Sequence, residues 1–275
     1  MTQNQDSPQR WLTRPVAITG ADGHVGRALQ RRLAGLPNPV RPLGRSDDWP
    51  SAFRDAVGVI HLAGTLQPRR PNTYRAANVG TVERCIDAVG GSSVQRVVFL
   101  SYVGADAAAS NAYLRTKGQA EQLVRRSATP AVVLRSTYVY GDPDDIGPSF
   151  ATYQARPHGT VWVLGDGAQR VAPIYVDDLG ALLLSAALDP AAPTGTFDVS
   201  GPTTSTLDEF VGRINPSGVT VRHVPAAAAR LLARAVPQLT PALVDVLLHD
   251  SVADGDPRET AGRFGVTLHD VAAAT

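Results

Sequence analysis

A short apolar segment, a glycine-rich turn and a helical pattern follow one another near the start of the chain. Residues 15–19 are apolar enough for a buried strand, residues 20–26 contain three glycines, and leucines then recur at helical spacing. Gly20 permits a tight turn, Gly23 lets a ligand approach the backbone, and Gly26 lets the helix pack on the strand. Because the amino end of such a helix offers free N–H groups to phosphates, this order predicts a dinucleotide-binding loop.

The residues after the second expected strand, 40–43, bear on which dinucleotide binds. An acid there would bind the ribose 2′-hydroxyl and select NAD. Gly44 and Arg45 stand there instead, and an arginine suits a 2′-phosphate. The sequence therefore favours NADP(H), with NAD(H) possible. Arginine is frequent in this chain, so a chance Arg45 is a serious alternative.

Residues 57–64 are interpreted as another buried strand. Ala63 and Gly64 at its end would leave room for the cofactor at the carboxyl edge of the sheet, where open α/β folds bind ligands. His61 has apolar neighbours, which favours a core histidine over a catalyst. The arginines of the following loop, residues 65–75, could meet an anionic substrate, although a solvated loop is the default interpretation.

Tyr113 and Lys117 are four residues apart in a helical pattern, so they project from the same face. Lysine and arginine total 26, and Lys117 is the only lysine. A cationic ammonium beside a phenol favours phenolate and lowers the phenol pKa. The pair thus indicates a tyrosine that exchanges a proton near neutral pH, the alternative being a surface helix with an incidental aromatic and cation.

Residues 131–135 predict a strand that leads into a turn at residues 136–141, and Ser136 in that turn would lie near the nicotinamide end of a cofactor. Asn78 is interpreted as the N-cap of an earlier helix. The Pro- and Gly-rich residues 142–159 are a candidate substrate lid.

The composition limits the classes of function. The 275 residues carry a net charge of +1 and 43% apolar residues, which is ordinary for a soluble protein and gives no case for nucleic acid. Cys85, the only cysteine, excludes an internal disulfide and lies in an apolar helical stripe, which favours packing. Residues 1–12 are expected to be a disordered tail without the apolar centre of a signal peptide. We expect a cytoplasmic protein without membrane insertion, a monomer with a dimer as the alternative, and no metal site.

A succession of motifs resembles one family along most of the chain: TGADGHVG, HLAG, NVGT, YLRTKGQAE, RSTYVYGD, PIYVDDL and SGPTTSTLDEF. The chain resembles the extended and atypical short-chain dehydrogenase/reductases, an NAD(P)-dependent epimerase/dehydratase-like group. It is most similar to the NAD(P)-binding branch that includes the 39-kDa-type accessory subunit of respiratory complex I. The resemblance covers roughly residues 14–215. It implies a Rossmann-type, doubly wound parallel α/β sheet with a smaller carboxyl-terminal portion that binds substrate.

The resemblance also assigns roles to residues. Tyr113 would be the proton donor or acceptor, and Lys117 would bind the nicotinamide ribose and lower the pKa of Tyr113. The family uses a Ser or Thr just after the preceding strand, but here Ser101 closes the strand and Tyr102 follows. Either Ser101 serves, or Tyr102 substitutes, or the function is missing. The expected cofactor-binding residues are Gly20, Asp22, Gly23, His24, Val25, Gly26, Arg45, Ala63, Gly64, Tyr113, Lys117 and Ser136.

These observations predict a cofactor-binding domain over residues 13–141 and a mainly substrate-binding portion over residues 142–275. Three later segments, residues 160–164, 174–188 and 196–200, are expected to return to the first domain. The leading hypothesis for the function is an NADP(H)-dependent oxidoreductase acting on a carbonyl or alcohol substrate. The alternatives are a sugar-nucleotide epimerase or dehydratase that uses the cofactor transiently, and a non-catalytic NADP(H)-binding sensor or assembly factor.

Overall fold

The computed structural model describes residues 13–34, 38–68, 71–141, 153–155, 157–236 and 239–270. Among these residues, six parallel strands form one sheet in the order β10-β5-β4-β3-β1-β2. The strands are β1 (Val16–Thr19), β2 (Val40–Leu43), β3 (Gly58–His61), β4 (Arg96–Tyr102), β5 (Ala131–Ser136) and β10 (Gly195–Val199). The predicted Rossmann-type parallel α/β sheet is confirmed.

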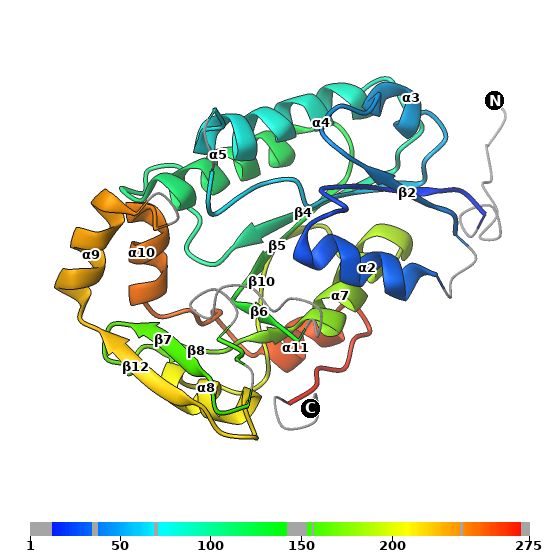
Figure 1. Cartoon of the computed structure of the whole chain (residues 1–275). Coiled ribbons are helices and arrows are strands. Elements are labelled where there is room, and N and C mark those ends of the chain that lie inside the picture. Colours follow the sequence, from blue (N-terminus) through cyan, green and yellow to red (C-terminus); the bar gives the residue numbers. More distant parts are fainter. Residues whose placement is uncertain are drawn as a thin grey trace, which may run out of the picture.

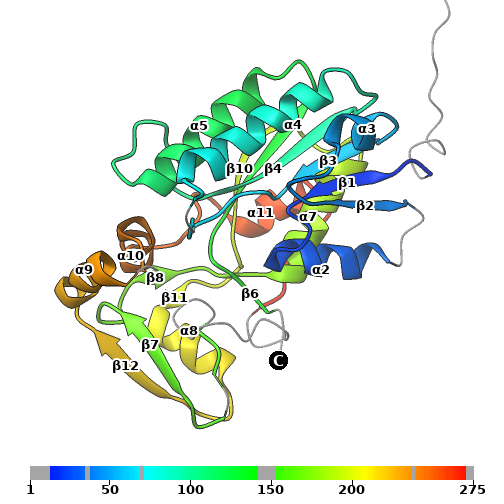
Figure 2. The ribbon, with the colours of Figure 1, turned by 45° about the horizontal axis from the view of Figure 1, so that its top comes forward.

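Helices cover both faces of this sheet (Figure 2). One face carries α3 (Trp49–Phe53), the π-helix η1 (Arg75–Gly80), α4 (Thr81–Val89) and α5 (Ala112–Arg126). The other carries α2 (His24–Leu33), α7 (Val176–Leu188) and α11 (Pro257–Gly262). Each central strand must therefore be apolar on both sides, which explains the continuous apolar runs in the sequence.

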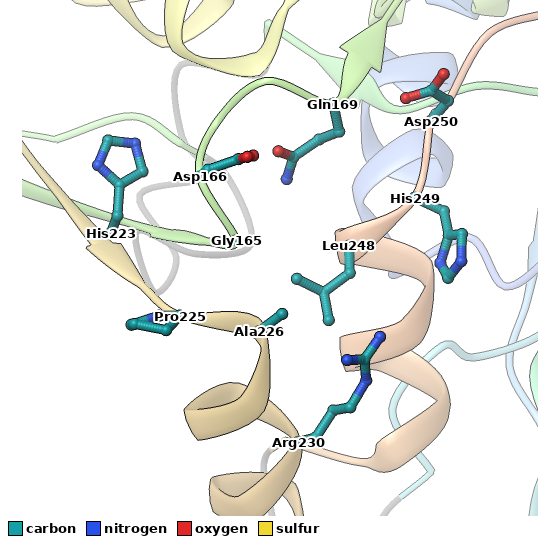
Figure 3. Close-up of a pocket in the computed structure, with 10 residues that line it drawn as sticks. All are labelled: Gly165, Asp166, Gln169, His223, Pro225, Ala226, Arg230, Leu248, His249 and Asp250. Atoms are coloured by element: carbon teal, nitrogen blue, oxygen red, sulfur yellow. The ribbon is translucent and has the colours of Figure 1, made fainter.

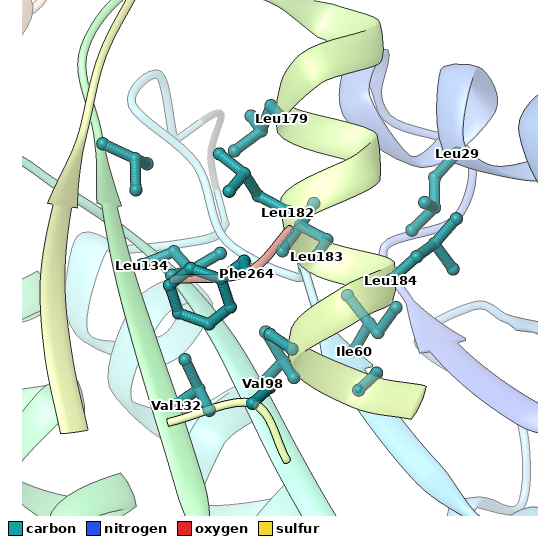
Figure 4. Packing of buried hydrophobic residues seen from close by; sticks show 14 of the residues in the cluster. Leu29, Ile60, Val98, Val132, Leu134, Leu179, Leu182, Leu183, Leu184 and Phe264 are labelled. Atoms are coloured by element: carbon teal, nitrogen blue, oxygen red, sulfur yellow. The ribbon is translucent and has the colours of Figure 1, made fainter. Parts of the chain in front are cut away.

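Alternate side chains of each strand enter different cores. In β3, Val59 joins the core beneath α3 and α4, whereas Ile60 joins the core beneath α2 and α7. The α7 core is the larger one, because α7 is rich in leucine and buries most of its surface. Figure 4 shows its packing, with labelled residues Leu29, Ile60, Val98, Val132, Leu134, Leu179, Leu182, Leu183, Leu184 and Phe264.

The remaining elements form a smaller portion beyond the edge of the sheet (Figure 1). It contains three two-stranded ribbons, which pair β7 (Thr160–Leu164) with β12 (Thr220–Val224), β8 (Arg170–Val171) with β11 (Ser205–Thr206), and β6 (Val139–Tyr140) with β9 (Ile174–Tyr175). Its helices are α8 (Leu207–Ile214), α9 (Ala226–Ala235) and α10 (Pro241–Leu248).

One predicted element is placed differently. The sequence led us to expect that residues 160–164 return to the first domain. They form β7, which pairs with β12 and does not join the large sheet. The reason is that Val161 and Val163 pack in a separate core with Phe210 and Val211 of α8. By contrast, β10 pairs with β5, and α7 packs against β3, β4 and β5.

Some predictions fall outside the described residues. These include the tail of residues 1–12 and most of the candidate lid of residues 142–159. Where the structure is described, no helix combines the length and the apolar character needed to cross a membrane.

Candidate functional site

In the glycine turn between β1 and α2, backbone segments approach one another closely, as the sequence predicts. Gly20 has a φ of +71°, and a Cβ atom on it would lie 2.7 Å from the backbone nitrogen of Ala63. A Cβ atom on Gly26 would lie 2.5 Å from the carbonyl oxygens of Gly20 and Ala21. Both positions therefore require glycine, and the turn packs directly against the segment that follows β3.

The amino end of α2 has no competing cap. Its N-cap residue is Gly23, which has no side chain to accept a hydrogen bond, and the first turn contains no acid. Its backbone N–H groups suit an anionic phosphate. Of the other predicted loop residues, Asp22 is exposed and its carbonyl accepts a hydrogen bond from Arg27, His24 is the first helical residue, and Val25 packs on the α7 core.

The loop after β2 is held by an arginine that the sequence analysis assigned no role. Arg84 of α4 donates to the carbonyl oxygens of Arg45 and Asp47, and its guanidinium lies 4.1 Å from the centroid of the Trp49 ring. The Asp47 carboxylate accepts a 2.8 Å hydrogen bond from Gly44 N. The side chain of Arg45 is exposed. Arg84 thus holds the backbone of the loop, while the side chain of Arg45, the predicted phosphate-binding arginine, is exposed to solvent.

His61 at the end of β3 is a core residue, as interpreted from the sequence. Its ring is buried between Trp49 and Phe99, and Nδ1 lies 2.8 Å from Thr19 Oγ1. Burial lowers the pKa of His61 to about 3, and the nearby Lys117 adds to this effect. The imidazole is therefore neutral at physiological pH.

Asn78 connects the end of β3 to the helix of the predicted catalytic pair. Its Oδ1 accepts a 2.8 Å hydrogen bond from Thr65 N, and its Nδ2 donates a 3.0 Å bond to Thr116 Oγ1. A Cβ atom on Gly64 would lie 2.9 Å from Asn78 Oδ1. The predicted N-cap role is wrong, because Asn78 lies inside the π-helix η1 and faces α5. The local pattern fitted a cap equally well, so only the fold reveals this role.

Lys117 is buried on α5, with a side chain that crosses to the end of β4. Its Nζ donates a 2.5 Å hydrogen bond to the carbonyl oxygen of Leu100 and lies 4.3 Å from the centroid of the Phe99 ring. Gly64 is also close, since a Cβ atom there would lie 4.0 Å from Nζ. Burial lowers the pKa of Lys117 to about 7, against an opposing effect of Glu121. The ammonium therefore titrates near neutral pH in the unliganded protein.

Tyr113 lies one helical turn before Lys117, but its surroundings are apolar. Burial raises the pKa of Tyr113 above its ordinary value, and Tyr102 and Tyr74 add to the increase. The shift is opposite to the lowering that the sequence predicted, because desolvation of the phenol disfavours its charged form. The ring centroids of Tyr102 and Tyr74 lie 5.8 and 6.4 Å from that of Tyr113.

Helix α10 covers Tyr113. Ala242 and Val246 pack on its ring, and two polar contacts hold the helix there. The Tyr74 hydroxyl lies 2.7 Å from Oγ1 of Thr240, the N-cap of α10. Asn111, which caps α5, donates a 3.0 Å hydrogen bond from its Nδ2 to the carbonyl oxygen of Ala242. The carboxyl-terminal portion thus closes over the predicted catalytic tyrosine.

The two candidate hydroxyls after β4 both have partners. Ser101 Oγ donates a 2.6 Å hydrogen bond to Oε1 of Glu121, which is fully buried. Glu121 also binds Arg135 through two contacts, of 2.7 and 2.8 Å. The Tyr102 hydroxyl lies 3.0 Å from Ser251 Oγ. The other predicted residue of this region, Ser136, is buried at the end of β5, and its hydroxyl donates a 3.5 Å hydrogen bond to the carbonyl oxygen of Ser101.

Glu121 is the buried group that the sequence analysis missed. It lies four residues after Lys117 and eight after Tyr113, so helical spacing already places all three on one face. This spacing was the feature of the sequence from which a role for Glu121 near the pair could have been predicted.

Two neighbouring cavities lie beside the end of α10, one within the smaller portion and one between α10 and the segments that follow β4. The larger, of about 1000 Å³, is lined by the β7–β8 turn, the end of β12, the start of α9 and the end of α10. Figure 3 shows its lining residues, Gly165, Asp166, Gln169, His223, Pro225, Ala226, Arg230, Leu248, His249 and Asp250. The second, of about 500 Å³, shares His249 and Asp250 with the first and extends to Tyr102. Space for a substrate-sized molecule therefore exists next to the tyrosine cluster.

Comparisons with known proteins agree with this architecture. The fold is similar to the crystal structure of human epimerase family protein SDR39U1 (isoform 2) with NADPH, with a TM-score of 0.75 and 19% identity over 94% of this chain and 97% of that one.

Sequence relatives include NADH dehydrogenase [ubiquinone] 1 alpha subcomplex subunit 9 of Arabidopsis thaliana, 24% identical over 70% of this chain and 55% of the relative. Another is a ceramide reductase of Caulobacter vibrioides, which is 26% identical over 62% of this chain and 60% of the relative. The chain thus matches a little over half the length of these relatives. Residues 16–199 match the model of the NAD dependent epimerase/dehydratase family. This protein, with its glycine turn, parallel sheet and Tyr113–Lys117 helix, belongs to the NAD dependent epimerase/dehydratase family.

Proposed function

We propose that this protein is an NADP(H)-dependent oxidoreductase that interconverts a carbonyl and an alcohol. The observation that carries the proposal is the attachment of the Tyr113–Lys117 face of α5 to the carboxyl edge of the sheet. Lys117 binds the Leu100 carbonyl at the end of β4, and Asn78 links Thr116 to the end of β3. The glycine turn contacts the same edge at Ala63.

The residues present fit a dinucleotide. Gly20, Gly23 and Gly26 would let the pyrophosphate approach the uncapped amino end of α2, and Ala63 and Gly64 leave the sheet edge free of bulky side chains. The exposed Arg45 would contact a 2′-phosphate, which favours NADP(H) over NAD(H). When bound, the nicotinamide exchanges a hydride with the substrate carbon.

Tyr113 would supply or accept the proton on the substrate oxygen, and Lys117 would bind the ribose hydroxyls. Burial keeps the Tyr113 phenol protonated at neutral pH, because its pKa is raised. A protonated phenol is the form needed to donate to a carbonyl oxygen, so the unliganded protein is prepared for reduction. The cavity of about 500 Å³ that Tyr102 lines would receive the substrate. A transient use of the cofactor, as in epimerases and dehydratases, would employ the same two side chains.

A second candidate function is binding of NADP(H) without turnover, as a sensor or assembly factor. Two observations favour it. Helix α10 covers Tyr113 through Ala242 and Val246, and the Ser101 hydroxyl is bound to Glu121. Neither arrangement is needed for cofactor binding alone. The helix opposes direct access of a substrate to the tyrosine, and the bond to Glu121 engages a hydroxyl that catalysis would need.

Tyr113→Phe distinguishes the two functions. We expect the purified variant to bind NADPH as tightly as the wild type in a fluorescence titration, and to lose about a hundredfold or more of its rate of NADPH oxidation with a panel of aldehydes and ketones. Tyr175→Phe, outside the site, is the matched control. Unchanged turnover in Tyr113→Phe would contradict the acid–base role, and NADPH binding without turnover by the wild type on the whole panel would favour the second candidate.

A further inference from the structure

The end of β4 carries two hydroxyl groups, on Ser101 and Tyr102, and their partners differ in chemistry. Ser101 is 3% exposed and donates its only proton to Oε1 of Glu121. A carboxylate accepts hydrogen bonds and offers none in return, so this bond uses the one proton that the serine has. Ser101 is therefore left without a proton for a substrate oxygen.

Tyr102 lines the cavity of about 500 Å³ beside the end of α10. Its ring packs edge-to-face against the ring of Tyr113, with 5.8 Å between the centroids. Tyr102 is also the last residue of β4, the strand whose Leu100 carbonyl binds Lys117. One phenol thus borders the proposed substrate cavity, the proposed catalytic tyrosine and the strand end that holds the lysine.

The Tyr102 hydroxyl is held by Ser251, which follows α10 and is 5% exposed. The two hydroxyl oxygens lie 3.0 Å apart, and Ser251 Oγ also accepts a 3.2 Å hydrogen bond from the backbone N–H of Tyr138. A serine hydroxyl has one proton and two acceptor positions. Because Tyr138 needs only an acceptor position, Ser251 can donate its proton to the Tyr102 oxygen, which leaves the Tyr102 proton for a substrate.

The Tyr102 phenol carries its proton at neutral pH, as a hydrogen-bond donor must. Burial raises the pKa of Tyr102 above its ordinary value, and the hydrogen bond with Ser251 acts in the opposite direction. Burial likewise raises the pKa of Tyr113. Both phenols are therefore protonated together, so that one can release a proton to a substrate oxygen while the other donates a hydrogen bond to it.

We propose that Tyr102 is a second catalytic residue, which donates a hydrogen bond to the substrate carbonyl oxygen, and that Ser251 is a positioning residue for its hydroxyl. The inference rests on the proposed reductase function. In the reduction, the hydride goes to the carbonyl carbon and the single proton, from Tyr113, goes to the oxygen. Tyr102 keeps its proton and stabilises the negative charge that develops on that oxygen. The balance of protons and electrons is therefore the same with and without Tyr102.

The competing role for the Tyr102–Ser251 contact is structural. The hydrogen bond joins the end of β4 to the segment after α10, and Ser251 also holds the backbone of Tyr138. A structural bond would affect stability, whereas a catalytic hydroxyl would affect the rate at nearly unchanged stability. The two roles therefore predict different kinetics for the same variants.

Steady-state kinetics of the full chain test the assignment, with NADPH and the most rapidly reduced aldehyde or ketone of the panel. Tyr102→Phe keeps the ring and removes the hydroxyl. We expect its kcat to fall about a hundredfold, while KM for the carbonyl compound and the NADPH dissociation constant change less than threefold. Ser251→Ala should lower kcat about tenfold, and it should lower kcat no further when added to Tyr102→Phe, because Ser251 acts through the Tyr102 hydroxyl.

Ser185→Ala is the matched control, because Ser185 lies on α7 and its Oγ donates one 2.7 Å hydrogen bond to the carbonyl oxygen of Phe264. It should leave kcat unchanged. Equal losses of kcat in Ser185→Ala and Tyr102→Phe, in step with their melting temperatures, would make the Tyr102–Ser251 bond structural and overturn the proposal.

The remaining outcomes separate this inference from the function on which it rests. A kcat of Tyr102→Phe within threefold of the wild type, with turnover lost in Tyr113→Phe, would overturn the role of Tyr102 alone. A tenfold loss from Ser251→Ala in the Tyr102→Phe background would overturn the positioning role of Ser251. Absence of turnover by the wild type on the whole panel would overturn the proposed function and the role of Tyr102 with it.

Discussion

Ser101 Oγ donates a 2.6 Å hydrogen bond to the buried carboxylate of Glu121, at the position where the sequence left a catalytic hydroxyl open. Glu121 also pairs with Arg135 and with Arg125. The serine therefore belongs to a charge network that ties α5 to β4 and β5. The sequence predicted Ser101 as a site residue, but its hydroxyl donates its proton to the Glu121 carboxylate.

Ser101→Ala should therefore affect stability more than chemistry. Losing one hydrogen bond to a charged group costs about 1.5–3 kcal/mol of the free energy of unfolding, while the NADPH dissociation constant and kcat should change less than twofold. Urea denaturation and steady-state kinetics measure the two effects. Tyr102→Phe is the companion variant, since it removes the other open hydroxyl. A loss of kcat by a hundredfold in Ser101→Ala at unchanged stability would restore the catalytic assignment.

Glu121→Gln should be strongly destabilising. It removes the charge that pairs with Arg135, and breaking a buried ion pair on one side costs about 3 kcal/mol, at the lower end because Arg135 is partly exposed. The matched control is Glu83→Gln, whose partner Arg75 is exposed and whose loss should cost less than about 1 kcal/mol. Denaturant midpoints of the two variants give the comparison. Equal midpoints would show that the Glu121 network contributes nothing beyond a surface pair.

Lys117 should make the stability of the unliganded protein rise with pH. Its pKa is lowered from 10.5 to about 7 in the folded state, so above about pH 7 the unfolded chain binds the additional proton. The free energy of unfolding therefore increases as pH rises from about 7 toward 10.5. Lys117→Met should remove this increase and stabilise the protein at neutral pH. This pH range is separate from that of His61, whose pKa is lowered from 6.5 to about 3. The contribution of His61 to the free energy of unfolding rises with pH only between about pH 3 and 6.5.

Urea denaturation across that pH range measures the effect. A wild-type curve that is flat above pH 7, or that falls in parallel with the Lys117→Met curve, would contradict the burial of an uncompensated lysine.

Arg84→Ala should weaken NADPH binding more than NADH binding. Arg84 fixes the carbonyl groups of Arg45 and Asp47, so its loss would free the loop that presents Arg45 to a 2′-phosphate. We expect about a tenfold loss for NADPH and less than threefold for NADH, by fluorescence titration. Arg75→Ala is the control, because Arg75 pairs with the exposed Glu83. Equal losses for both cofactors would mean that the loop does not read the 2′-position.

Cys85 should be inert in the native protein. It is buried among apolar side chains, and burial raises the pKa of its thiol to about 12. Reaction with a disulfide reagent should proceed only after unfolding in urea. Stoichiometric labelling within minutes under native conditions would contradict the packing role.

The sequence alone determined the local features of this protein. The glycines of residues 20–26 and the apolar runs of β1, β3, β4 and β5 depend on contacts within one turn or along one strand, and such contacts follow from residue type and spacing. The same is true of the four-residue spacing of Tyr113 and Lys117.

Only the tertiary structure decided what surrounds those residues. The pairing of β7 with β12, the Asn78–Thr116 bond, the partner of Ser101 and the cover of α10 over Tyr113 all join segments that are distant in the sequence. The cover explains the wrong prediction for the Tyr113 pKa. Helical spacing placed a cation on the same face as the phenol, but burial raises the pKa of Tyr113. Part of that burial comes from α10, whose residues lie more than a hundred positions later in the chain.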